Sequence, residues 1–291
     1  MTENRIRGWY NHFNGNVYIS FSGGKDSTVL LNIARSIYPD IKAMYVDTGL
    51  EYPEIREFVK TFDNVDIIRP KKSFYQVIKE YGYPVISKEV AEKIEYIRKG
   101  AKWALKFIDD ETKSPYNIKK WKFLVDAPFK ISNKCCYFMK KSPAHKYTKE
   151  TGLMPITAQM AVESKLRTQK WLQNGCNAFD AKNPISNPMS FWTENDVLQY
   201  IYENNIKVCS VYGNIEKVDS NIFDQIDFQK EGTYRCTGLN RTGCVFCMFG
   251  VQLEKHPNRF ERLKKTNPKY YDYCINKLEL NKVLDYLEVD Y

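Results

Sequence analysis

The apolar residues in the first quarter of the chain follow two kinds of pattern. Short, nearly continuous apolar runs end near Phe21 and recur within 41–49 and 65–70, as expected for buried strands. Between these runs, apolar residues recur every three or four positions in 25–37 and 53–62, which predicts helices. Strands that alternate with helices in this way predict an α/β fold with a doubly wound, mainly parallel sheet.

The rest of the chain adds helical patterns and one further strand. We expect the strand at 154–159, and helices at 74–81, 88–99, 163–172 and 193–202. Residues 100–130 show no clear period and predict an irregular insertion. Basic and aromatic residues alternate at helical spacing over 257–291. We therefore expect one α/β domain at 1–250, followed by a helical C-terminal extension at 251–291.

A glycine turn joins the first strand to the first long helix. It reads Ser22, Gly23, Gly24, Lys25, Asp26 and Ser27. Such a turn brings free backbone N–H groups and the positive end of a helix to one spot, which suits an anion, above all a phosphate. The two glycines allow a close backbone approach, and the serine hydroxyls and the lysine add donors.

Two common phosphate-binding motifs do not match this turn. A Walker A loop needs a glycine where Ile19 stands and a serine or threonine where Asp26 stands, and the dinucleotide G-x-G-x-x-G pattern is absent. The sequence instead resembles the pyrophosphate loop of the adenine-nucleotide α-hydrolase (PP-loop) superfamily. Asp47, Thr48 and Gly49 follow the second strand, and the ligand crevice of an open parallel sheet lies at that edge.

Composition narrows the class of protein. The chain has 291 residues, of which 43% are hydrophobic and 27% charged, as in a globular protein. The net charge of +9 suits a polyanion such as nucleic acid or a small anionic substrate, although a generally basic enzyme fits equally well. No apolar run is long enough to cross a membrane, so we expect a cytoplasmic protein without a membrane partner.

Eight cysteines in such a protein call for an explanation other than disulfides. Cys244 and Cys247 are two residues apart, a spacing that lets one turn present two thiolates to a metal or cluster. Cys135 and Cys136 form a tandem pair beside lysines, which favour thiolates. Two pairs supply the four ligands of a [4Fe–4S] cluster, and adjacent cysteines are awkward for structural zinc. Cys236 could replace one member of the tandem pair.

These motifs together resemble one family. The glycine turn, the Tyr45–Gly49 segment with Glu51-Tyr52-Pro53, the tandem cysteines with Lys140, and the Cys244–Cys247 pair occur in the order seen in phosphoadenylyl-sulfate (PAPS) and adenylyl-sulfate reductases. The double cysteine with a C-x-x-C pair is typical of the branch that holds a [4Fe–4S] cluster beside the nucleotide.

The resemblance implies roles for particular residues. The glycine turn would hold phosphate or sulfate, Asp47, Thr48 and Gly49 would line the adenosine side, and the four paired cysteines would bind the cluster. Lys140 falls where the family places a cation between cluster and substrate, and Arg167 resembles an arginine that meets the anionic end of the substrate. We take Lys25, Asp26 and Lys140 as the candidate catalytic residues.

The reaction itself stays open between alternatives. The reductases use a cysteine in a Glu-Cys-Gly-x-His segment, which this sequence does not contain, and Cys274 is the cysteine that follows Cys247. One hypothesis is a sulfonucleotide reductase acting on adenylylated sulfate with a thiol partner protein. Another is an ATP-dependent enzyme, which Mg²⁺ could assist, that takes sulfur from a donor protein and modifies tRNA or DNA. A third is a sensing module that binds the nucleotide without chemistry.

Overall fold

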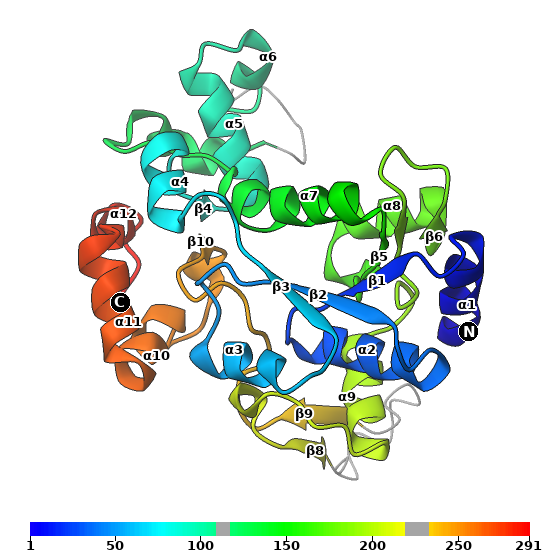
Figure 1. Cartoon of the computed structure of the whole chain (residues 1–291). Coiled ribbons are helices and arrows are strands. Elements are labelled where there is room, and N and C mark those ends of the chain that lie inside the picture. The colour runs from blue at the N-terminus through cyan, green and yellow to red at the C-terminus, as the bar shows by residue number, and fades with distance from the viewer. Residues whose placement is uncertain (109–116, 219–232) are drawn as a thin grey trace, which may run out of the picture. The chain divides into compact units, whose positions relative to one another are not determined.

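A computed structural model describes residues 1–108, 117–218 and 233–291, and its contacts divide the chain into two compact units (Figure 1). The first unit comprises residues 1–47, 51–69 and 144–242, and the second comprises 48–50, 70–143 and 243–291. This division differs from the expected domain at 1–250 with a separate helical tail. The C-terminal helices instead belong to the same unit as residues 70–143, because their contacts are mainly with that segment.

A six-stranded sheet forms the centre of the first unit. Its order is β3 (Val65–Ile68), β2 (Lys42–Val46), β1 (Val17–Ser20), β5 (Met154–Ile156), β7 (Ile185–Ser186) and β6 (Asn177–Ala178). Every neighbouring pair is parallel except the pair of β6 and β7 at the edge. The doubly wound, mainly parallel α/β fold expected from the sequence is thus confirmed, whereas β6 and β7 lie in stretches where no strand was expected.

The other elements of this unit are mainly helices. They are α1 (Thr2–His12), α2 (Lys25–Ile37), α3 (Pro53–Lys60), most of α7 (Ser142–Thr151), η3 (Ala161–Glu163), α8 (Lys165–Asn174), α9 (Glu194–Glu203) and η4 (Ser210–Tyr212). Buried residues of α2, α3 and α9 form one hydrophobic core with β1 and β2. A small antiparallel sheet of β8 (Ile215–Val218) and β9 (Thr233–Cys236) contributes to the same core. The helix expected at 163–172 begins and ends two residues later.

The second unit is largely helical. It contains α4 (Phe74–Tyr81), α5 (Lys88–Arg98), α6 (Lys102–Leu105), η1 (Lys119–Asp126), η2 (Tyr137–Lys141), η6 (Val251–Leu253), α10 (Arg259–Thr266), α11 (Pro268–Asp272), η7 (Tyr273–Lys277) and α12 (Leu280–Tyr286). Two short strands, β4 (Val85–Ile86) and β10 (Met248–Phe249), pair in parallel and tie its N-terminal part to its C-terminal part. The expected helices at 74–81, at 88–99 and within 257–291 are confirmed.

One arginine organises the segment expected to be irregular. The guanidinium of Arg98, at the end of α5, donates to the carbonyls of Val125 at 2.9 Å, Phe129 at 2.6 Å and Ala127 at 2.9 Å, and also to that of Leu124. These bonds satisfy carbonyls that η1 leaves open where it ends. The middle of the expected insertion, 109–116, lies outside the described residues. Among the helices of the described chain, none is long and apolar enough to cross a membrane.

Candidate functional site

The glycine turn of the first unit is folded by its own serines. The backbone N–H of Ser22 donates to Oγ of Ser27 at 3.1 Å, and the two hydroxyl oxygens lie 2.9 Å apart. Gly24 is the N-cap of the 13-residue helix α2, and no side chain caps that end. Gly23 has a φ of 70°, which favours glycine. The turn therefore presents the N-terminus of a long helix that no N-cap side chain closes, which is a favourable place for an anion.

Lys25 is not a free donor at this turn. Its side chain is buried, and its ammonium donates to the carbonyl of Asn240 at 2.8 Å, pairs with Glu194 at 3.0 Å and lies 3.7 Å from Asp26. Burial alone would lower the pKa of Lys25, but the two carboxylates outweigh it and raise that pKa. Lys25 thus connects the start of α2 to the start of α9, a role that the sequence motif did not indicate.

One carboxylate oxygen of Asp26 lacks a hydrogen bond. Its Oδ1 is buried and has no hydrogen-bond partner. Burial raises the pKa of Asp26, the neighbouring Lys25 lowers it, Glu194 raises it and Arg241 lowers it, and the net shift is upward. A buried acid with an unsatisfied oxygen and a raised pKa is a common feature of binding and catalytic sites.

Two guanidinium groups lie within electrostatic range of Asp26. Burial lowers the pKa of Arg167, the nearby charge of Arg241 lowers it further, and Asp26 opposes both. Arg167 also pairs with Glu163 one helical turn away. Arg241 is thus near enough to oppose the charge of Arg167, and such like charges are unfavourable unless an anion lies near both. The turn expected to hold phosphate is therefore flanked by Arg167, as the resemblance implied, and by Arg241, which the motifs missed.

Tyr212 contacts the glycine turn at the first residue of α2. Its hydroxyl accepts a hydrogen bond from the backbone N–H of Lys25 at 3.2 Å and forms another, at 2.6 Å, with Oγ1 of Thr242. The ring lies 5.7 Å from the ammonium of Lys25. Tyr212 is almost completely buried, so its hydroxyl holds the first residue of α2 in a fixed place. Nothing in the local sequence distinguishes this tyrosine from the other twenty.

The three residues expected at the adenosine side divide between the units. Asp47, in the first unit, is buried and accepts hydrogen bonds from Arg56 at 3.3 Å and Arg69 at 3.2 Å. Thr48 and Gly49 belong to the second unit, where Oγ1 of Thr48 accepts from the backbone N–H of Leu50 at 3.1 Å. Asp47 is therefore engaged by two arginines, and the adenosine role of this segment stays a prediction.

The four paired cysteines lie together in the second unit. The sulfurs of Cys135 and Cys136 are 3.9 Å apart. The pKa of Cys135 is raised by its hydrogen bond to Cys136, by burial and by the charges of Cys247 and Cys244. The hydrogen bond from Cys135, together with nearby lysines that include Lys140, lowers the pKa of Cys136 to about 6 although burial opposes this.

Electrostatic proximity does not by itself make a metal site. Within the described residues, no group of three or more His, Cys, Asp or Glu side chains is arranged to hold a metal ion. The cluster ligation by these cysteines therefore stays a prediction. Cys236 lies on β9 in the hydrophobic core of the first unit, whereas the four paired cysteines lie in the second unit. Cys274 is fully buried in η7, and burial raises its pKa, so it is a poor nucleophile.

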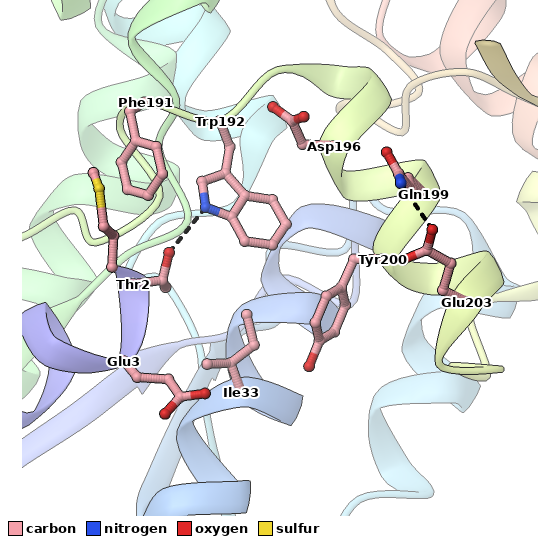
Figure 2. A pocket seen from close by; sticks show the side chains of 10 residues that line it. Thr2, Glu3, Ile33, Phe191, Trp192, Asp196, Gln199, Tyr200 and Glu203 are labelled. Carbon is pink, nitrogen blue, oxygen red and sulfur yellow. Dashed lines mark hydrogen bonds between the residues drawn. The ribbon is translucent and has the colours of Figure 1, made fainter. Parts of the chain in front are cut away.

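A separate cavity of about 510 Å³ opens in the first unit between α1, α2 and α9 (Figure 2). Trp192 and Tyr200 form part of its wall, and Nε1 of Trp192 donates to Oγ1 of Thr2 at 2.9 Å. Three carboxylates, those of Glu3, Asp196 and Glu203, also line it. None of the site residues expected from the sequence lies in its wall, and its acidic character does not suit an anionic nucleotide.

Comparison with known proteins identifies the family. The family model for the phosphoadenosine phosphosulfate reductase domain matches residues 16–99 and 86–248, which is most of the chain. The chain belongs to this family. The resemblance that the motifs carried is thereby confirmed, and with it the expectation of an enzyme family of sulfur metabolism.

Relatives of this family member are distant. Two uncharacterized proteins of Methanocaldococcus jannaschii are 21% identical over 89% of this chain and 28% identical over 47% of it. The matches cover 47% and 29% of those two proteins, so the chain spans about half the length of the first and under a third of the second. The adenosine 5′-phosphosulfate reductase of Geobacillus kaustophilus is 22% identical, with 68% of this chain and 67% of that protein covered.

A solved structure is also similar. The phosphoadenylyl-sulfate reductase of Candida auris, in a phosphate complex, matches 72% of this chain and 82% of its own chain with 17% identity and a TM-score of 0.42.

Proposed function

We propose that this family member is a sulfonucleotide reductase-like enzyme that binds adenylylated sulfate at the glycine turn of its first unit. The observation that carries the proposal is the helix N-terminus at Gly24, which has no N-cap side chain and is flanked by the guanidinium groups of Arg167 and Arg241. An anion there would gain from the backbone N–H groups and the helix dipole and would relieve the repulsion between the two arginines.

The other residues of the turn position this anion. Glu194 and Asn240 hold the ammonium of Lys25. Lys25 therefore fixes the start of α2 and adds positive charge to the site without extending its side chain to the ligand. Tyr212 holds the backbone of the same residue. The unsatisfied Oδ1 of Asp26 is the group in this site that gains a partner when a donor of the ligand, or a hydrated Mg²⁺ in the case of ATP, arrives.

For the second unit we propose that Cys135, Cys136, Cys244 and Cys247 hold a [4Fe–4S] cluster. The support is the donor set: four thiols whose charges affect one another, with lysines that favour the thiolate form. Such a cluster would supply redox or electrostatic chemistry to the bound sulfonucleotide. Anaerobic purification should give a brown protein with about four irons per chain, and the double variant C244S/C247S should lose the iron while Cys236→Ser keeps it.

The nucleotide proposal is tested by titration calorimetry with adenylyl sulfate, its 3′-phosphorylated form, ATP with Mg²⁺, and AMP. Arg241→Ala should weaken adenylyl sulfate at least about tenfold, the equivalent of about 1.4 kcal/mol for one charge-assisted contact. The matched control is Arg235→Ala in the same unit, because Arg235 is exposed and pairs with Glu216 on the neighbouring strand. Equal losses in both variants would mean a general charge effect and would overturn the assignment.

The reaction is tested separately. With thioredoxin as the thiol partner, the cluster-loaded protein should release sulfite from adenylyl sulfate. If it binds ATP more tightly than adenylyl sulfate and releases no sulfite, the ATP-dependent transfer of sulfur from a donor protein to nucleic acid takes the place of this proposal. If it binds adenylyl sulfate and transforms none of the substrates, the sensing hypothesis takes its place.

A further inference from the structure

A second cavity lies wholly in the second unit beside Cys136, and the proposed function assigns it no ligand. It has a volume of about 390 Å³. Its walls come from the end of α4, the start of α5 and the segment from Asn133 into η2, and comprise Tyr81, Lys88, Asn133, Lys134, Cys136, Tyr137, Phe138 and Lys141. This volume is in the range of small-molecule sites and exceeds what a lone oxyanion needs.

The charge of this cavity is positive. Three lysines line it and no carboxylate does, and the thiol of Cys136, whose pKa Cys135 and the lysines lower, opposes only part of their charge. Among the described residues, none of the three ammonium groups forms a salt bridge, whereas the acids nearest in sequence, Glu80 and Glu89, each pair with a lysine outside the lining. Residues 127–149 contain six lysines and no acidic residue. Three unpaired cations around one hollow repel one another, and a multiply charged anion would remove that cost.

The rings of this cavity add a second kind of contact. Tyr81 and Phe138 stack with their centroids 4.5 Å apart, and the ammonium of Lys72 covers them at 5.0 Å and 5.3 Å. These two rings are therefore already occupied on their faces. Tyr137 is different: it meets Phe138 edge-on, at 84°, and is half exposed. A flat ligand ring can stack on Tyr137 while an attached anion reaches the lysines.

We infer that this cavity binds a nucleotide, with its phosphate among Lys88, Lys134 and Lys141 and its base stacked on Tyr137. Lysines that meet phosphates beside an open aromatic face are the combination that binds single nucleotides and single strands. The amide of Asn133 offers a hydrogen-bond donor and acceptor for the sugar or the base edge. The ligand is either a free nucleotide or one nucleotide of a single strand, because both present the same groups.

The test uses the full chain and pyrimidine probes, which do not carry the adenine expected at the glycine turn. Uridine 5′-monophosphate and a 5′-phosphorylated hexauridylate are titrated at low salt. The double variant K134Q/K141Q should weaken both probes at least about tenfold, and Tyr137→Ala should weaken them severalfold while Tyr137→Phe keeps binding, since stacking of one base contributes about 1–3 kcal/mol. Lys255→Gln, an exposed lysine of the same unit outside the lining, is the matched control.

The outcomes separate this site from the one in the first unit. Arg241→Ala should leave uridylate binding unchanged, and if it abolishes that binding, the probe occupies the glycine turn and the inference fails. Hexauridylate that binds at least about tenfold more tightly than the monophosphate, with a salt slope of about −0.7 per phosphate contact, identifies a strand. Equal affinities identify a free nucleotide. Lack of binding by both probes overturns the inference.

Protein footprinting of the unmodified chain guards against a folding defect in the variants. Acetylation of Lys88, Lys134 and Lys141 should slow when uridylate is present, while acetylation of Lys255 stays constant. Uniform slowing at all four lysines would indicate non-specific association and would count against the site.

Discussion

Gly23 packs tightly within the glycine turn, and this gives a prediction whose size follows from the structure. A Cβ added there would lie 2.8 Å from Cγ2 of Val59 and 2.9 Å from Cγ2 of Ile55, both on α3 and both buried. The φ of 70° adds the cost of a left-handed conformation for any residue with a side chain. We expect Gly23→Ala to lower the free energy of unfolding by about 1–2 kcal/mol through the backbone conformation and by about 1–3 kcal/mol through the overpacking.

Gly152 provides the matched control. It has a φ of 73°, and nothing lies within 4 Å of the position that its Cβ would take. Gly152→Ala therefore carries only the backbone cost, about 1–2 kcal/mol, partly offset by the smaller entropy of the unfolded chain. Both glycines lie in the first unit, so both substitutions affect the same cooperative structure.

Urea unfolding followed by circular dichroism measures both variants. Gly23→Ala should lose about 1–3 kcal/mol more than Gly152→Ala, and it alone should weaken the binding of adenylyl sulfate, because α3 and the turn must move apart. If the two variants lose the same stability within about 0.5 kcal/mol, the contacts between Gly23 and α3 do not constrain the turn and the reasoning fails.

Three further substitutions test other parts of the structure. Arg98→Met should cost about 2–6 kcal/mol, since it removes four hydrogen bonds of about 0.5–1.5 kcal/mol each to carbonyls within 124–129, whereas its exposed neighbour Lys99→Met should cost at most about 0.5 kcal/mol; the readout is faster hydrogen exchange confined to that loop. Tyr212→Phe should cost about 1–2 kcal/mol of stability and weaken nucleotide binding, because the N–H of Lys25 loses a buried acceptor. An unchanged affinity would contradict the positioning role of Tyr212. Asp26→Asn should stabilise the protein at pH 7: the raised folded pKa means that the stability of the natural protein falls as the pH rises from the ordinary aspartate range towards that pKa. The gain should shrink as the pH approaches 4. Thermal unfolding measured between pH 4 and pH 7 checks this, and a gain that grows towards pH 4 would contradict the reasoning.

Local patterns predicted much of the first unit. The alternation of apolar runs and helical periods from Val17 to Ile68 indicated three strands and two helices, and each lies where expected within about two residues. The strands β6 and β7 were missed because each has only two residues, too few to show a period. Their pairing depends on the contact of Asn177 with Ser186, which no local pattern encodes.

The sequence patterns also did not predict the division into two units. The helical character of 257–291 was evident, but its partner was not, because the packing of these helices depends on residues more than a hundred positions away. The carbonyl of Leu278, for example, accepts a hydrogen bond from the hydroxyl of Tyr83 at 3.0 Å. Surface complementarity between distant segments leaves no signature in either segment alone.

By itself, the sequence determined the fold class, the family and the location of the glycine turn, because periods and short motifs are properties of neighbouring residues. Only the tertiary structure decided what surrounds that turn. It places the ammonium of Lys25 against the carbonyl of Asn240, 215 positions away, and the charge of Arg241 beside Asp26. Both are long-range contacts, and a charged group's role is fixed by the partners that folding brings to it, since burial and neighbouring charges determine which donors remain for a ligand.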